Sequence, residues 1–446
     1  MLHKLKNISL KIPYNLLAVR PVLLYASNKK SVITLAFFNF YVKLFKMTSI
    51  LNKNYNKTLY ACCFGYIVQS VVNNFLPLLF AHFATFYGIP FYLISFIVFY
   101  NFGLQIIVDS FSANLTLKLG YRKTAILSCV IAMLGLLVLG VTSIFTKNSV
   151  VIYIAILISV TFMAVGGGIT EVILSPLVEA LPLNNKSAKM NLLHSFYCVG
   201  HILVVVLATL FFKFIGIDFW FIFSLILTLV PIVGILLFIN CPIITPQGDD
   251  KPVKKLQLFK NKTFILFFII MIMAGSMEQA VAQWISFYAE EGLQVDKATG
   301  DVIGVLTFAT FMFISRLFFG LKKNNFNVGK SLFICALLMV VTIILSAIIP
   351  QKFVSLLLFS LSGLFVGLTW PGTYAYAGET FKAGGTVMFS LLALGGDIGC
   401  TLGPSLVGVI SEFTSLEIGV LSSIIFPIIM AVLTFILLKR NKNSEK

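Results

Sequence analysis

Residues 117–145 have the sequence LKLGYRKTAILSCVIAMLGLLVLGVTSIF, a short basic stretch followed by an uncharged apolar run. The hydrocarbon core of a bilayer is roughly 30 Å thick and a helix rises 1.5 Å per residue, so about 20 apolar residues cross it. The run 124–145 has that length and predicts a transmembrane helix. Its basic start is typical of a loop on the cytoplasmic side of a membrane.

The same criterion, applied outward along the chain, predicts twelve spanning helices. They cover residues 58–82, 90–112, 124–145, 150–175, 190–214, 218–239, 264–288, 300–321, 330–349, 353–376, 386–410 and 416–438. We therefore expect an all-α integral membrane protein with twelve transmembrane helices in two pseudo-symmetric six-helix halves. The halves are residues 58–239 and 264–438, joined by a cytoplasmic linker at 240–263 and followed by a basic cytoplasmic tail at 439–446.

The composition of the chain supports this fold class. Hydrophobic residues make up 59% of the 446 residues and charged residues only 11%, whereas a soluble protein has about 25% charged residues. The net charge of +17 does not indicate nucleic-acid binding, because the basic residues lie in short breaks between apolar runs. Alternate loops and the C-terminal tail hold eighteen Lys and Arg, and the opposite loops hold four. By the positive-inside rule we expect both termini to be cytoplasmic. The Lys-, Asn- and Ile-rich residue usage is typical of an AT-rich bacterial genome, so we expect the membrane to be a bacterial cytoplasmic membrane.

Residues 1–57 form a basic N-terminal extension and lead-in. Residues 1–46 contain no acidic residue, and their longest apolar run, 31–41, is too short to span a bilayer. A second methionine, Met47, opens an ordinary polar lead-in to the first helix, so we expect translation to start there. The alternatives are a basic segment lying on the anionic inner leaflet or a targeting presequence.

The motifs of enzymes and metal proteins are missing from the sequence. The seven cysteines are scattered without a CxxC pair, and there is no GxxxxGK[ST], HExxH or GxSxG pattern. We therefore expect no enzymatic activity, no metal and no cofactor. The partners we expect are the lipid bilayer, a small-molecule substrate and H⁺, and we expect the protein to be a monomer.

A glycine and two amide residues recur with the same spacing in the two halves. Gly65, Gln69 and Asn73 in the first helix recur as Gly275, Gln279 and Gln283 in the seventh. Such repeats across a central linker are typical of transporters with the substrate site between the halves near the midplane.

Several motifs resemble one family of transporters. The loop LKLGYRK (117–123) is similar to the short loop signature of the major facilitator superfamily. MNLLHSFYCVG (190–200), GSMEQAVAQW (275–284), TWPGTYAYAGETF (369–381) and GGTVMFSLLALGGDIG (384–399) resemble its branch of fucose permease and related sugar carriers. The resemblance, over about residues 55–440, implies sugar:proton symport. The loop departs from the superfamily pattern at Ala113 and Leu117, which stand in place of the usual Gly and Asp.

Ionisable residues inside spanning helices are costly, so they are candidates for function. We expect substrate binding or proton coupling at Glu171, Glu278 and Asp397, with a bond between helices as the alternative for each. The imidazole of His194 suits coupling. Neutral groups suited to hydroxylated ligands are Gln69, Asn73, Asn101 and Gln283, and the two tryptophans that suit stacking on a sugar ring are Trp284 and Trp370.

A second group is expected at the cytoplasmic gate and its loop. It consists of Asp109, Gly120, Arg122, Lys123 and Arg316. Asp109 is expected to pair with Arg122 or Lys123, and the resemblance implies that Arg316 is a gate or helix-pairing group near the cytoplasmic side. Bending points are expected at Pro176 and Pro371.

The sequence leaves three functions open. The leading one is secondary active transport by alternating access, as proton symport of a sugar-like or small polar solute. Within transport, efflux of drugs or metabolites is the alternative. A non-transporting membrane sensor belongs to a different class and would not need polar groups converging from both halves.

Overall fold

The computed structural model describes residues 55–146, 148–182, 186–243, 258–321, 327–381 and 385–444. The predictions for residues 1–54, including the start at Met47, and for most of the linker lie outside the described residues. Within those ranges all regular structure is helical, and twelve helical segments are long and apolar enough to cross a membrane. The prediction of an all-α protein with twelve spanning helices is confirmed.

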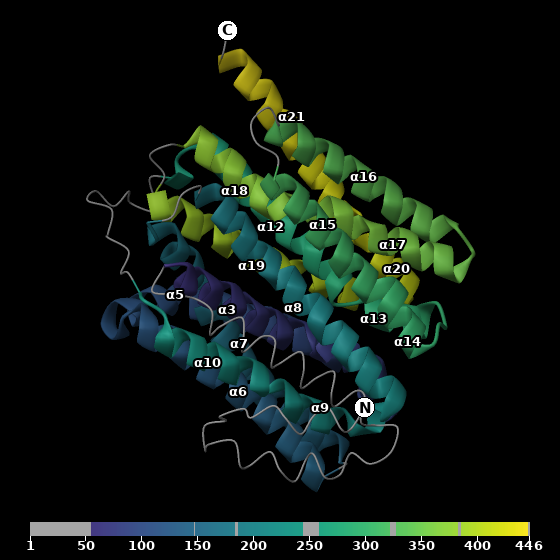
Figure 1. The fold of residues 1–446 in the computed structure, drawn as a ribbon. Coiled ribbons are helices and arrows are strands. Elements are labelled where there is room, and N and C mark those ends of the chain that lie inside the picture. Colours follow the sequence, from purple (N-terminus) through teal and green to yellow (C-terminus); the bar gives the residue numbers. More distant parts are fainter. Residues whose placement is uncertain are drawn as a thin grey trace, which may run out of the picture. The chain divides into compact units, whose positions relative to one another are not determined.

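The first six spans contain the helices of the N-terminal set (Figure 1). They are α3 (Asn56–Asn74), η3 (Leu76–Leu79), α4 (Phe80–Thr85), α5 (Phe91–Leu119), α6 (Tyr121–Phe145), α7 (Ser149–Ala180), α8 (Lys186–Phe214), η4 (Ile217–Phe219), α9 (Trp220–Leu227) and α10 (Leu229–Asn240).

The other six spans form the C-terminal set. They are α12 (Lys262–Ala282), α13 (Ile285–Phe287), η5 (Tyr288–Gly292), α14 (Lys297–Gly300), η6 (Asp301–Leu306), α15 (Thr307–Leu321), α16 (Val328–Ile348), α17 (Lys352–Val366), α18 (Thr369–Thr380), α19 (Gly385–Phe413), α20 (Leu416–Ser422) and α21 (Ile425–Ser444).

Local sequence explains where several of these helices begin and bend. Asn148 caps α7 by accepting hydrogen bonds from two backbone N–H groups, and Gly120 turns the chain between α5 and α6 at a φ of 78°. The tenth span breaks at Gly367 and Leu368, next to Pro371, as expected. The expected break at Pro176 does not occur, because α7 continues as a helix through that residue.

Two names are used below for the ends of the spanning bundle. The odd-loop end holds the connections 86–90, 215–216, 293–296, 349–351 and 414–415, and the linker end is opposite. The two helix sets meet mainly where α5 packs on α19 and where α8 packs on α15. Figure 1 shows α8 and α19 near the centre of the bundle. Any site between the sets is therefore lined by them and by their immediate neighbours.

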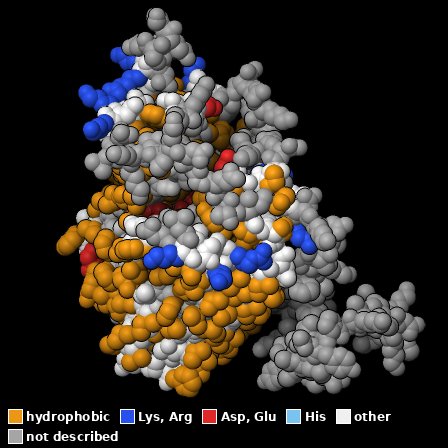
Figure 2. Space-filling model, turned by 90° about the vertical axis from the view of Figure 1, so that its left-hand side faces the viewer, with side chains coloured by type: hydrophobic (Ala, Val, Ile, Leu, Met, Phe, Trp, Pro, Cys, Tyr) orange, Lys and Arg blue, Asp and Glu red, His pale blue; other side chains and the backbone are white. Residues whose placement is uncertain are grey.

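The outside of the bundle is apolar. Large hydrophobic side chains such as Phe111, Phe145 and Phe413 are between 65% and 83% exposed. Figure 2 shows hydrophobic side chains covering much of one face, with Lys and Arg gathered in a row beyond them. An apolar surface of this extent is stable only against lipid. The protein is a multi-pass membrane protein.

Glycines let α12 and α19 approach closely. A Cβ atom at Gly275, Gly399 or Gly403 would overlap the backbone of the other helix. Small residues at such a contact allow packing without side chains between the two backbones. The contact fixes α19 against α12 and so places Asp397 and Glu278, which these helices carry.

Candidate functional site

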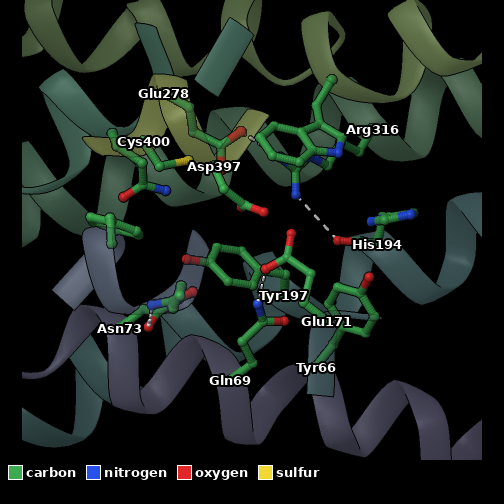
Figure 3. Close-up of a pocket in the computed structure, with 14 residues that line it drawn as sticks. Tyr66, Gln69, Asn73, Glu171, His194, Tyr197, Glu278, Arg316, Asp397 and Cys400 are labelled. Carbon is green, nitrogen blue, oxygen red and sulfur yellow. Dashed lines mark hydrogen bonds and ion pairs between the residues drawn. The ribbon is translucent and has the colours of Figure 1, made fainter. Parts of the chain in front are cut away.

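A cavity of about 50 Å³ lies between the two helix sets. Figure 3 shows side chains from both sets pointing into it. The residues that line it are Tyr66, Gln69, Asn73, Phe102, Gln105, Glu171, His194, Tyr197, Glu278, Gln279, Arg316, Trp370, Asp397 and Cys400. Seven of the ten residues predicted for substrate binding or coupling are among them, together with Arg316.

The N-terminal wall of the cavity is built on α3 and α7. Tyr66, Gln69 and Asn73 share one face of α3, because residues three, four and seven apart lie close together on a helix. Gln69 Nε2 donates a hydrogen bond to Glu171 Oε2 on α7. The Tyr66 hydroxyl lies 3.1 Å from the Ser175 hydroxyl. Glu171 is thus held by a neutral amide rather than by a cation.

The C-terminal wall contains a buried ion pair. Arg316 on α15 lies 2.7 Å from Glu278 on α12, and both side chains are 6% exposed. Arg316 Nη1 also donates to the carbonyl oxygen of His194, 3.2 Å away on α8. The guanidinium therefore neutralises Glu278 and links the two helix sets. Arg316 lines the cavity, and its expected place near the cytoplasmic side stays a prediction.

Asp397 on α19 faces Asp109 on α5. The two carboxyl groups lie within hydrogen-bonding distance of each other. Asp397 is 3% exposed, and its Oδ2 atom has no hydrogen-bond partner. Figure 3 shows Glu171 and Asp397 pointing toward one another from opposite walls. Asp397 therefore faces two other acidic side chains, Asp109 and Glu171.

The expected pairing of Asp109 with Arg122 or Lys123 is wrong. Arg122 instead donates hydrogen bonds to the carbonyl groups of Phe238, Ile239 and Cys241 at the end of α10. Carbonyl groups at a helix C-terminus lack partners in the helix and attract a cation. Gly120, Arg122 and Lys123 are exposed and lie outside the cavity.

Amide side chains at the cavity are connected by hydrogen bonds. Gln105 Nε2 donates to Asn73 Oδ1 over 3.1 Å. Gln283 Nε2 donates to Gln279 Oε1 over 3.0 Å and to the Asn73 carbonyl over 3.4 Å. Gln283 therefore connects α12 to α3 behind the cavity and does not line it. Asn101 is buried one turn before Gln105 and also lies outside the lining.

The two predicted tryptophans have different positions. Trp370 lines the cavity and packs on Gly396, where a Cβ atom would overlap the indole ring. Trp284 is fully buried at the odd-loop end, and its N–H donates to the Pro404 carbonyl over 2.9 Å. Its ring contacts Phe80 and Phe91 of the other helix set. Trp284 therefore closes the odd-loop end rather than lining the cavity.

Sequence reasoning missed Tyr66 and Tyr197. The ring of Tyr66 meets that of His194 edge-on, with centroids 5.2 Å apart, and the Tyr197 hydroxyl accepts a hydrogen bond from Asn74 at 3.2 Å. Tyr197 follows His194 by three residues and so shares its helix face. That spacing, together with the hydroxyl group, was a usable signal.

A second cavity, of about 280 Å³, lies at the odd-loop end. It is lined by Ala81, His82, Thr85, Thr209, Phe212, Lys213, Ile217, Glu290, Glu291, Lys297 and Ala298. Lys297 lies 2.8 Å from Glu290 and 2.9 Å from Asp301, and it donates to the Ser286 hydroxyl over 3.1 Å. The seventh span is longer than the predicted 264–288, because it extends through Glu290 and Glu291 as the π-helix η5.

The comparisons with known proteins agree with this geometry. The model of the Major Facilitator Superfamily matches residues 58–350, and the chain belongs to that superfamily of membrane transporters. A crystal structure of the Escherichia coli fucose:proton symporter aligns with a TM-score of 0.62 and 16% identity, covering 86% of this chain and 99% of that one. The expected membership of the superfamily is confirmed, and the fold is similar to that of the fucose symporter.

Two further solved structures align with the chain. A second structure of the fucose symporter, in the outward conformation, has a TM-score of 0.62 and 16% identity, with 85% of this chain and 98% of that one covered. A bacterial homologue of the human lysosomal transporter Spinster, inward-facing and occupied, has a TM-score of 0.59 and 11% identity, with 86% and 97% covered. No curated protein sequence matches the chain.

Proposed function

We propose that this protein carries a small sugar-like or polar solute together with protons across the bacterial cytoplasmic membrane by alternating access. The observation that carries the proposal is the chemistry of the central cavity. Its walls combine neutral amides and tyrosine hydroxyls with the indole of Trp370. Such groups donate and accept hydrogen bonds and present an aromatic face, which are the features that a hydroxylated ligand needs.

Proton coupling follows from the partners of the cavity acids. Glu278 is neutralised by Arg316, whereas Glu171 is held by Gln69 and Asp397 meets Asp109. An acid without a cation can take up and release a proton as the site is exposed to one side or the other. Glu171 and Asp397 are therefore the proposed carriers of the proton, and Glu278 positions Arg316 between the helix sets.

The size of the cavity supports alternating access. About 50 Å³ is far below the roughly 300–1,000 Å³ of ordinary small-molecule sites. A monosaccharide would fit only after the two helix sets move apart. At the odd-loop end Trp284, Phe80 and Phe91 hold the sets together. With the linker end in the cytoplasm, as the distribution of Lys and Arg indicates, this contact closes the outer side.

Efflux of apolar drugs is the competing function within the superfamily. A site for such drugs is lined mainly by apolar side chains, whereas most residues around the central cavity carry polar groups. The polar lining favours the polar solute.

The test begins with thermal unfolding of the purified protein in the presence of fucose, other monosaccharides, nucleosides, small carboxylic acids and common drugs. A ligand that binds only the folded state stabilises it by RT ln(1 + [L]/Kd), so weak ligands are detected at high concentration. The solute that stabilises is then offered to proteoliposomes with and without an inward proton gradient. We expect a hydroxylated solute to stabilise and the gradient to accelerate its uptake. Stabilisation only by apolar drugs would overturn the proposal.

A further inference from the structure

Asp109 and Asp397 form a contact between the two helix sets. Asp109 belongs to α5 and Asp397 to α19, and these helices run antiparallel along the interface. Nearer the odd-loop end, Gly408 of α19 packs against the Ser95 side chain of α5. Fourteen residues separate Ser95 from Asp109, which is about 21 Å along a helix. The acid pair therefore lies on the linker-end side of the same interface.

The surroundings of the pair are built for close approach. The Asp109 carboxyl lies against Gly168 of α7, where a Cβ atom would come within 3.1 Å of Oδ1. Asp397 Oδ2 and Asp109 Oδ1 are both buried without a hydrogen-bond partner. The pair thus has two unused acceptor atoms in a site that is closed to solvent at Asp397.

The titratable groups that face the pair supply no positive charge. They are Glu171 on α7, Cys400 on α19 and Tyr374 on α18, with Glu278 on α12 acting on Glu171 and Cys400. Arg316 is occupied by Glu278, and Arg122 by the end of α10. Among the described residues, no positively charged side chain is left to compensate the pair, so we look for a bound cation.

A proton is the cation that fits. Two ionised carboxylates are acceptors only, so a hydrogen bond between two carboxyl groups requires that one carries a proton. A metal ion needs more ligands than the two carboxyl groups supply, and within the described residues no group of three or more His, Cys, Asp or Glu is placed to hold one. A hydrogen bond at this contact would therefore need one bound proton, shared by one residue of each helix set.

We propose that Asp109 and Asp397 are a proton-operated latch for the linker-end side of the transporter. With the proton bound, the hydrogen bond holds α5 to α19 and keeps that side closed. When the proton leaves, two like charges face each other across the interface and push the helix sets apart. This proposal assigns the proton-coupling site of the proposed symport and therefore rests on that function. The opening of the latch in response to pH can nevertheless be measured without any solute.

The experiment measures the opening without any solute. Spin labels are placed on cysteines introduced at Lys118 of α5 and Glu379 of α18, which are both exposed near the linker end. The background carries Cys335→Ser, since the other six native cysteines are buried. Distances in lipid nanodiscs are recorded by pulsed electron resonance between pH 5 and 9. We expect one short distance at low pH and a growing longer population as the pH rises.

The matched variants separate the pair from other acids. In Asp109→Asn/Asp397→Asn the amides hydrogen-bond without a proton, so the short distance is expected to persist at every pH. Single Asp109→Asn gives the same result if the double variant does not fold. Glu412→Gln changes an exposed acid on α19, the helix that carries Asp397, and should keep the wild-type response to pH. A wild-type distance that ignores pH, or a double variant that responds like the wild type, overturns the proposal.

Further results distinguish the proton latch from a Na⁺ site and from the proposed transport function. Recovery of the short distance at pH 9 by NaCl but not by choline chloride would assign the site to Na⁺ and overturn the proton latch. Proton-driven uptake without a pH-dependent distance would keep the proposed function and remove the latch. A pH-dependent distance without proton-driven uptake of any solute would keep the latch and remove the proposed function.

Discussion

Two buried groups of acids in this protein have opposite surroundings. At the odd-loop end Glu290 and Asp301 share the ammonium of Lys297, at 2.8 and 2.9 Å. On the linker-end side of the cavity Asp109 and Asp397 face each other, with Glu171 nearby. The first group is compensated by a lysine, whereas among the described residues no cation faces the second group, to which the proposed latch assigns a proton. The residue type is the same, so the presence of a cation decides whether an acid stabilises the fold or is available for coupling.

The largest expected effect comes from removing the cation of the first group. Lys297→Met leaves Glu290 and Asp301 without a positive partner, and Asp301 is only 1% exposed. Breaking a buried pair in this way costs about 4 kcal/mol of unfolding free energy. Thermal or denaturant unfolding of the purified protein measures it. Lys213→Met, at an exposed lysine of the same cavity, is the control and should have little effect. Equal loss in both variants would remove the distinction.

The ion pair of the central cavity is expected to respond next. Glu278→Gln removes the negative charge beside Arg316 and leaves it only neutral partners, such as the carbonyl groups of Gly367 and His194, so we expect a loss of about 3 kcal/mol. Glu278→Gln/Arg316→Gln removes both charges and should recover part of that loss. A double-mutant cycle on unfolding free energies gives the coupling. No recovery in the double variant would mean that the two charges act independently.

Removing one acid of the unpaired group should affect transport rather than folding. Glu171→Gln keeps the shape and the oxygen that accepts from Gln69 but cannot release a proton. We expect uptake driven by a proton gradient to fall about 10-fold or more, equal to about 1.4 kcal/mol, while solute exchange without a gradient persists. Proteoliposome assays with and without the gradient measure both. Equal loss of both activities would indicate a structural role for Glu171.

A solvated acid completes the comparison with the smallest effect. Asp296 is exposed at the start of α14, where it accepts the Thr299 N–H over 3.0 Å, and this hydrogen bond lowers the pKa of the Asp296 carboxyl. Asp296→Ala should cost about 1 kcal/mol of unfolding free energy at neutral pH. Because the pKa is lowered on folding, the contribution is present above the ordinary Asp value of about 3.9 and is lost below it. Unfolding curves at pH 7 and pH 3 test this, and a cost that persisted unchanged at pH 3 would contradict it.

Much of the candidate site was visible in the sequence because charge and polarity are rare inside spans. Glu171, Glu278 and Asp397 stand out against apolar neighbours, and all three line the cavity. The helical spacing of polar residues predicted the lining of the cavity less well. Gln283 continues the stripe of Gln279, yet only Gln279 reaches the cavity, because the helix ends at Ala282 and the chain turns there. Trp284 lies past the same break and points to the odd-loop end.

The sequence by itself determined the twelve spans, because a bilayer requires about 20 apolar residues with every backbone hydrogen bond made inside the helix. Only the tertiary structure decided which acid meets which partner. A span that is apolar on all sides carries no stripe to mark the face it turns to its neighbours. The pairing of Glu278 with Arg316 and of Asp109 with Asp397 depends on the contact of helices far apart in the chain. Small residues help to place these helices: Gly399 lets the backbones of α19 and α12 approach closely, and Gly168 leaves room for the Asp109 side chain.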